Sequence, residues 1–193
     1  MEVQVCIPVG PGHEELYKEA KASAEDLGFD VIVIDDTQGK LGRSKARNIG
    51  LDKATAEWVF FLDADDVMHK DAKKAKKYKE FDGIWGLIND GKVRTPQVRC
   101  MDLKTLLTHE PTQTLQMGCF VRSEIAKIVR FDESMDCGED YKFYLNLWSN
   151  YRCTKIPFTL FVNRRGNHST GPRSATGQDW RRAVTSLQET WRV

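Results

Sequence analysis

Residues 58–66 read WVFFLDADD, in which five large apolar residues are followed directly by three aspartates and one alanine. A short, uninterrupted apolar run is typical of a strand that is buried on both faces of a parallel sheet. Residues 31–34 form a second run of this kind, which leads into Asp35 and Asp36. Ligands of open α/β sheets bind beyond the carboxyl ends of the strands. The two acidic strand ends therefore predict a ligand site at that edge.

The rest of the chain predicts an α/β fold, with a mainly parallel central sheet flanked by helices. Residues 3–9 form a further apolar strand, and helical patterns cover 13–27 and 44–54 between the strands, an alternation typical of parallel sheets. Beyond residue 66, the sequence predicts helices at 69–80, 102–108, 123–129, 139–149 and 178–191, and strands at 84–88, 93–100, 116–121 and 154–163.

Length and composition exclude several classes of protein. A chain of 193 residues with 40% hydrophobic and 30% charged residues is the size of one domain, and it is neither collagen-like nor low-complexity. The longest apolar run, 58–62, is far shorter than a membrane span, and residues 1–5 do not resemble a secretory signal. Five irregularly spaced cysteines favour reduced thiols, so a cytoplasmic protein is expected. The net charge of +1 points to no partner.

The acidic strand ends suit a divalent cation. Asp63 and Asp65 form an Asp-x-Asp pair, and oxygen ligands of this kind bind Mg²⁺ or Mn²⁺ together with waters and substrate phosphates. A simpler interpretation is that these acids cap the following helix at its positive end.

Residues 42–50, GRSKARNIG, lie between the two acidic ends and begin a helix with three cations. A helix N-terminus favours an anionic ligand, and the guanidinium of Arg47 suits the oxygens of a diphosphate. The alternative is a solvated basic helix face. Carboxylates, a metal and phosphate-seeking arginines together indicate a site for a nucleotide diphosphate.

Five segments in this order resemble glycosyltransferase family 2, whose members have the GT-A fold. They are the strand that ends in Pro8, Asp35-Asp36, residues 46–50 (ARNIG), residues 61–66 (FLDADD) and residues 131–140 (FDESMDCGED). The resemblance covers about residues 3–170. It implies a single GT-A domain over 1–193, with a nucleotide-binding half at 1–66, a reduced acceptor-side half at 67–170 and a C-terminal tail and helix at 171–193.

The resemblance also implies roles for individual residues. Asp35 or Asp36 would hydrogen-bond the base, Arg47 would lie near the diphosphate, and Asp63 would lie near the ribose and a metal-bound water. The residues that it places around the nucleotide are Pro8, Val9, Gly10, Asp35, Asp36, Arg43, Arg47, Asp63 and Ala64. Those that it places at the metal are Asp65 as the direct ligand, Asp63, and His168 near the metal or phosphate. The catalytic residues that it implies are Asp140, as the base, and the adjacent Glu139.

The implied activity is inverting transfer of one sugar, dependent on Mn²⁺ or Mg²⁺. The donor would be a nucleotide-diphosphate sugar, with a UDP-sugar expected, and the acceptor a hydroxyl of a glycan, a lipid-linked sugar or a modified DNA base. Residues 178–182 (QDWRR) match part of the Gln-x-x-Arg-Trp motif of processive members, but Arg182 stands where tryptophan should. We interpret this match as chance and expect a single transfer.

Two other classes stay open. An apolar strand followed by Asp-x-Asp also fits a phosphatase of the haloacid-dehalogenase type, although that motif usually follows the first strand. A non-catalytic module that binds a nucleotide sugar or a polyanion is the second alternative.

Residues 69–79 carry six lysines in eleven positions. On a helix, Lys73, Lys76 and Lys77 share one face, and Ala72 and Ala75 can pack on the other. Lys70–Lys79 therefore form either a solvated helix face or a contact surface for an anionic surface or a nucleic acid.

Overall fold

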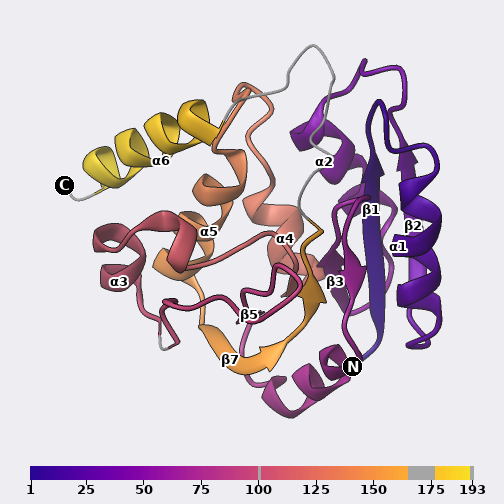
Figure 1. Ribbon diagram of the computed structural model, residues 1–193, viewed down its shortest axis with the longest axis horizontal. Helices are drawn as coiled ribbons and strands as arrows, with labels where there is room; N and C mark the ends of the chain where they lie inside the picture. The colour runs from indigo at the N-terminus through magenta and orange to yellow at the C-terminus, as the bar shows by residue number, and fades with distance from the viewer. Residues whose placement is uncertain (100, 165–176, 192–193) are drawn as a thin grey trace.

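A six-stranded sheet runs through the middle of the molecule (Figure 1). The computed structural model describes residues 1–99, 101–164 and 177–191. The strands are β1 (Val3–Val9), β2 (Asp30–Asp35), β3 (Trp58–Phe61), β5 (Gly83–Leu87), β6 (Cys119–Arg122) and β7 (Cys153–Thr159), in the order β2-β1-β3-β6-β5-β7. Pairing is parallel except where β6 meets β3 and β5. The predicted α/β class with a mainly parallel sheet is confirmed.

Helices cover both faces of the sheet. One face packs against α1 (Leu16–Glu25) and the 3-10 helix η1 (Lys70–Tyr78). The other packs against α2 (Arg43–Lys53), α4 (Ser123–Val129) and α5 (Glu139–Asn150). The remaining elements are a small sheet of β4 (Val67–Met68) and β8 (Phe161–Val162), a short turn η2 (Pro111–Gln113), and α3 (Leu103–Thr108) and α6 (Gly177–Trp191), which pack beside α5.

Strand β3 is buried on both faces, as its apolar run predicted. Phe60 contributes to the core under α1 and η1, whereas Phe61 contributes to the core under α2 and α5. Phe61 meets the rings of Phe131 and Phe143 edge to face, at centroid distances of 5.0 and 5.7 Å. This packing fixes the carboxyl end of β3, from which the acidic residues follow.

Helix α2 lies unusually close to β1 because Gly50 has no side chain. A Cβ atom at this position would lie 2.1 Å from the Cys6 sulfur. The close approach anchors α2 along the sheet and directs its N-terminus toward the carboxyl edge of β1 and β2.

Three sequence expectations need correction. Of the strand expected at 93–100, the described residues 93–99 do not form one: the Gln97 side-chain oxygen accepts the Ile88 N–H at 2.9 Å, and Pro96 has no N–H to donate to a ladder. The lysine-rich segment is a 3-10 rather than an α-helix, so Ala72 and Ala75 are buried at three-residue spacing. The strand expected at 154–163 is divided between β7 and β8.

None of the helices in the described part of the chain combines the length and the apolar character that crossing a membrane requires.

Candidate functional site

A cavity of about 240 Å³ lies at the carboxyl edge of the sheet. It brings together residues that follow β1, β2 and β3 with the first turns of α2 and α5. The residues named from the sequence that line it are Pro8, Gly10, Asp36, Arg43, Arg47, Asp63, Ala64, Asp65, Glu139 and Asp140. Val9 is buried within β1, Asp35 is exposed beside it in the pairing register, and His168 lies outside the described residues.

Arg47 occupies the centre of this site. Its guanidinium donates to Asp63 Oδ1 at 2.7 Å and to Glu139 Oε1 at 3.0 Å, and its side chain is only 4% exposed. Burial alone would lower the pKa of Arg47, but the two carboxylates outweigh it, so the pKa is raised and the guanidinium stays charged. Arg43, one turn earlier, has a side chain that is 42% exposed. Arg43 donates to the Asp136 carbonyl at 3.2 Å and lies 3.7 Å from Glu139, but of the two arginines it is the one more accessible to a ligand.

The two acids after β2 differ in what they contact. Both carboxylate oxygens of Asp36 accept backbone N–H groups, from Leu41 and Gly42 at 2.8 Å each. Gly42 has a φ of +79°, a conformation that glycine adopts without strain, and it begins α2. Asp36 therefore shapes the loop before α2. Asp35 is exposed and accepts the Thr37 N–H at 2.9 Å, with the Thr37 side chain as a second donor, so its remaining lone pairs can accept from a ligand.

The acids after β3 repel one another. Burial and the neighbouring Asp63 raise the pKa of Asp65, and burial together with Asp63 and Asp65 raises the pKa of Asp66 to about 8. Asp66 is satisfied by the Arg164 N–H at 3.0 Å and the Asn163 amide at 3.3 Å. Asp65 faces the cavity, so a cation bound there would relieve the repulsion.

The donor set fits a hard cation that is shared with a phosphate. In the described part of the chain, no three His, Cys, Asp or Glu side chains converge into a metal-binding group. Mg²⁺ and similar ions commonly bind through one or two carboxylates plus waters and substrate phosphates. Asp65, with Asp63 beside it, supplies that minimum, and His13 Nε2 lies 4.0 Å from Asp65 Oδ2.

Asp140 lies in the first turn of α5, on the wall of the same cavity. Its Oδ1 accepts the Tyr141 N–H at 2.7 Å and the indole N–H of Trp180 at 3.1 Å. Burial, followed by the charge of Glu139, raises the pKa of Asp140 to about 6. The carboxyl group is thus mostly ionised at neutral pH and close to the pKa that suits proton transfer.

Sequence reasoning missed several residues of the cavity. The missed residues are His13, Gly42, Ala46, Met117, Asn163 and Arg164. Arg164 donates from Nε to the Asp65 carbonyl at 2.9 Å and pairs with Glu19. Asn163 and Arg164 directly follow β8, so the rule that polar residues at strand ends mark a site could have found them. His13 gave no such signal, because the sequence predicted that a helix begins there.

A mixed α/β sheet whose carboxyl edge holds clustered carboxylates and arginines places the molecule in the class of α/β proteins with a crevice for a polar ligand. The family model for glycosyl transferase family 2 matches residues 13–133, more than half of the sequence, and the chain belongs to this family. The resemblance stated from the motifs is confirmed.

Two relatives illustrate the similarity in sequence. The amylovoran biosynthesis glycosyltransferase AmsB of Erwinia amylovora is 31% identical over 132 residues, which cover 57% of this chain and 42% of AmsB. The uncharacterized glycosyltransferase MJ1057 of Methanocaldococcus jannaschii is 24% identical over 132 residues, which cover 62% of this chain and 45% of that protein. The chain spans less than half the length of either relative.

Solved structures share the fold. Residues 1–349 of S. aureus TarS in complex with UDP-GlcNAc give a TM-score of 0.66 at 18% identity, covering 99% of this chain and 66% of that one. Glucosyl-3-phosphoglycerate synthase from Mycobacterium tuberculosis, in complex with Mn²⁺, UDP-glucose and phosphoglyceric acid, gives a TM-score of 0.58 at 11% identity. The match covers 86% of this chain and 72% of that one. The expected GT-A fold is confirmed.

Replacing Arg47 tests its structural role. Arg47→Met leaves the buried Glu139 carboxylate with only the longer contact to the exposed Arg43, at 3.7 Å, so the free energy of unfolding should fall by about 3–5 kcal/mol in urea titrations. Arg130→Met is the control: it removes an exposed pair with Asp52, 2.6 Å apart. A loss of at most about 1 kcal/mol is expected there. Adding Glu139→Gln to Arg47→Met should recover part of the loss. Equal losses in the two single variants would contradict the bridging role.

Proposed function

We propose that this chain carries out inverting transfer of a single sugar from a UDP-sugar to an acceptor hydroxyl, with Mn²⁺ or Mg²⁺ bound. One observation carries the proposal: a single cavity joins the carboxylates Asp63 and Asp65 to Asp140, whose pKa lies near neutrality. A metal-binding acid pair and a carboxylate base on the same cavity are what transfer from a diphosphate donor requires. The donor is inferred from the structural neighbours, which were solved with UDP-GlcNAc and UDP-glucose.

The donor end of the cavity supplies base and phosphate contacts. Pro8 and Gly10, on either side of the buried Val9, would pack against the base, and the exposed carboxylate of Asp35 would accept a base N–H. The diphosphate would lie at the N-terminus of α2, beside the exposed guanidinium of Arg43. Arg47 is committed to Asp63 and Glu139, so it would act by holding these two carboxylates in place.

Asp65, with Asp63, would hold the cation. When bound, the cation neutralises charge on the diphosphate as it leaves. Asp140 would remove the proton from the acceptor hydroxyl, whose oxygen forms a bond to the anomeric carbon as the bond to the diphosphate oxygen breaks. The attack comes from the side opposite to the leaving group, so the anomeric configuration inverts. The proton remains on Asp140 and UDP departs.

The alternatives differ in testable ways. Family membership excludes a haloacid-dehalogenase phosphatase, and Asp63 follows the third strand rather than the first. A non-catalytic nucleotide-sugar module would bind the donor without releasing UDP.

The metal assignment is tested by calorimetry with UDP in the presence and absence of Mn²⁺. Asp65→Ala should abolish the Mn²⁺-dependent part of UDP binding, because a single remaining carboxylate leaves the cation under-coordinated. Asp30→Ala, an exposed acid at the opposite end of β2, should bind like the wild type. Unchanged Mn²⁺-dependent affinity in Asp65→Ala would refute the site.

The base assignment is tested by UDP release from UDP-glucose and UDP-GlcNAc, with water or glycerol as the acceptor. Asp140→Asn should lower the release rate by about 10²–10⁴-fold while UDP binding is kept, because the amide cannot take a proton. In the wild type, the ionised carboxylate is the active form. The rate should therefore fall about tenfold per unit as the pH drops below the Asp140 pKa of about 6. A wild-type rate of UDP release in Asp140→Asn would refute Asp140 as the base.

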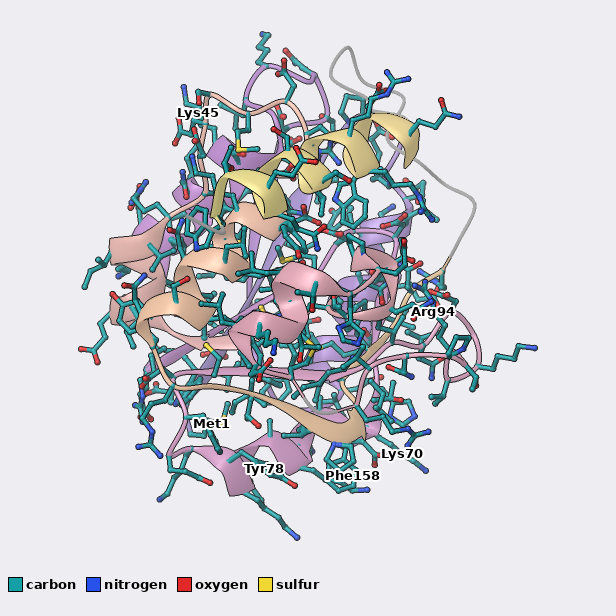
Figure 2. The ribbon with its side chains drawn as sticks, turned by 90° about the vertical axis from the view of Figure 1, so that its left-hand side faces the viewer. Met1, Lys45, Lys70, Tyr78, Arg94 and Phe158 are labelled. Atoms are coloured by element: carbon teal, nitrogen blue, oxygen red, sulfur yellow. The ribbon has the colours of Figure 1, made fainter. Side chains whose placement is uncertain are left out.

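The lysine-rich helix lies at the other end of the molecule from this cavity. Figure 1 shows η1 beside the N-terminus at the bottom of the view and α2 near the top. In Figure 2, Lys70 and Tyr78 lie at the bottom of the molecule and Lys45 of α2 at the top. The length of β1, seven residues at about 3.3 Å each, gives a separation of about 23 Å. We therefore propose that this segment does not bind the reacting end of the acceptor.

Two lysines of η1 lie on the wall of an apolar pocket of about 200 Å³. Met1, Val3, Phe29, Ala72 and Phe120 line the pocket, together with Lys73 and Lys76. In the described chain, Lys74 pairs with Asp71 at 2.9 Å. No ion pair is found there for the other five. Lys70, Lys73, Lys76 and Lys79 follow the three-residue spacing that aligns side chains on a 3-10 helix, whereas Lys77 aligns with Lys74. We call these four residues and the exposed Lys77 beside them the lysine face. We propose that the lysine face rests on an anionic lipid bilayer, because each lysine near such a surface contributes about 1 kcal/mol and the pocket offers apolar contact.

Vesicle sedimentation tests this surface. Lys73→Glu/Lys76→Glu/Lys77→Glu should lose binding to vesicles that contain phosphatidylglycerol, and high salt should weaken wild-type binding. The control Lys53→Glu/Lys92→Glu/Lys104→Glu makes the same change of charge at exposed lysines elsewhere and should keep binding. Equal binding to neutral phosphatidylcholine vesicles, or binding to duplex DNA without binding to vesicles, would overturn the bilayer as the partner.

A further inference from the structure

The C-terminal helix α6 reaches the proposed catalytic carboxylate. Trp180, in its first turn, donates its indole N–H to Asp140 Oδ1 at 3.1 Å, across 40 positions of sequence. Both residues lie beyond the segment 13–133 that the family model matches. The contact thus belongs to a part of the chain for which the family match assigns nothing.

Two contacts fix the first turns of α6, and one of them is made by the Trp180 ring. It meets the Tyr141 ring edge to face at 6.5 Å, with planes at 89°. Ala183, one turn later, packs on Gly138, where an added Cβ would lie 3.0 Å from the alanine methyl group. This close approach brings the first turn of α6 onto the N-terminus of α5, where Asp140 lies.

Further along, α6 is fixed to the body of the protein. Val184 is fully buried against the core, and the Gln188 side chain donates to the Leu106 carbonyl at 3.0 Å, the His109 carbonyl at 3.2 Å and the Tyr141 hydroxyl at 2.9 Å. A buried amide with three acceptors has little freedom to shift. Helix α6 is therefore a rigid support for the indole.

Resting on the proposed transfer reaction, we infer that Trp180 is a positioning residue, which fixes Asp140 so that one carboxylate oxygen faces the acceptor. Oδ1 is occupied by two N–H donors, from Tyr141 and Trp180. No hydrogen bond of Oδ2 is found among the described residues, and Asp140 lines the cavity, so Oδ2 is the oxygen left for the acceptor proton.

The same bond stabilises the ionised form of Asp140. Burial and Glu139 raise the pKa of Asp140, whereas the Trp180 N–H, Arg47 and the Tyr141 N–H lower it. The other titratable groups that interact with this carboxyl are Tyr144 on α5 and Cys137 before it. Of these influences, only Trp180 comes from α6, so its removal leaves the rest of the set in place.

The test compares Trp180→Phe with Trp191→Phe. Trp180→Phe keeps an aromatic ring and loses the donor. Trp191→Phe is matched, because Trp191 lies on the same helix and donates its indole N–H to Ser149 Oγ at 3.0 Å, away from Asp140. Two measurements are made on each variant: the Asp140 pKa by carbon NMR of the carboxyl group, and the pH profile of UDP release from UDP-glucose and UDP-GlcNAc.

Trp180→Phe should raise the Asp140 pKa by about one unit, since a hydrogen bond to a charged group is worth about that much. The acid limb of UDP release should move to higher pH by the same amount. The rate should fall about twofold at pH 7 and about tenfold well below pH 6, with Mn²⁺-dependent UDP affinity unchanged. Trp191→Phe should match the wild type in all of these.

An unmoved Asp140 pKa in Trp180→Phe overturns the inference, and so does an equal shift in Trp191→Phe, which would trace the effect to general loosening of α6. The proposed function fails separately: a wild-type protein that releases no UDP refutes the transferase, while an NMR shift confined to Trp180→Phe still shows that the indole controls this carboxylate.

Discussion

The guanidinium of Arg47 joins three parts of the chain that lie far apart in sequence: helix α2, the loop after β3 and the first turn of α5. Burying a single cation at 4% exposure would be strongly unfavourable, and two carboxylates at 2.7 and 3.0 Å make it tolerable. The bridge requires α2 to lie close to the sheet, which the missing side chain of Gly50 permits. Once it forms, the acids after β3 and the first turn of α5 face the same cavity.

The cavity divides its acids into two groups. Asp63 and Glu139 share the fixed charge of Arg47. At Asp65 the charges of His13 and Arg164 do not outweigh burial and the repulsion from Asp63, and the pKa values of both Asp65 and Asp66 are raised. A protein that needed only stability would gain from neutral side chains at the second group. Keeping carboxylates where they repel is reasonable when a cation that arrives with the substrate completes the site. The built-in cation thus sets the geometry, and the proposed exogenous cation supplies the missing charge.

How much the sequence revealed depended on the range of the interactions. The strand at 58–61 and its acidic end were predictable because burial on both faces and the position of strand ends are local patterns. Arg47 was found, but its partners were not: its pairing with Glu139 joins residues 92 positions apart. The prediction of a strand at 93–100 was wrong for the described residues 93–99, because the Gln97 side-chain amide accepts the Ile88 N–H that a neighbouring strand would have bonded. The role of Trp180 was hidden in the segment 178–182, which was read against a motif whose tryptophan lies two positions later.

The near-zero net charge of the chain conceals a separation of charge. The proposed metal-binding acids gather at the carboxyl edge of β1 and β3, and the lysine face lies about 23 Å away, at the other end of β1. A molecule with this asymmetry turns in the field of an anionic surface until its basic end faces that surface. The cavity then opens away from the surface, where a nucleotide donor is not repelled by surface charge, because screening acts over about 8–10 Å. Under this arrangement an acceptor attached to the same surface must extend about two to three Debye lengths to reach Asp140. An extended or polymeric acceptor satisfies that distance, whereas a hydroxyl held at the level of the head groups does not.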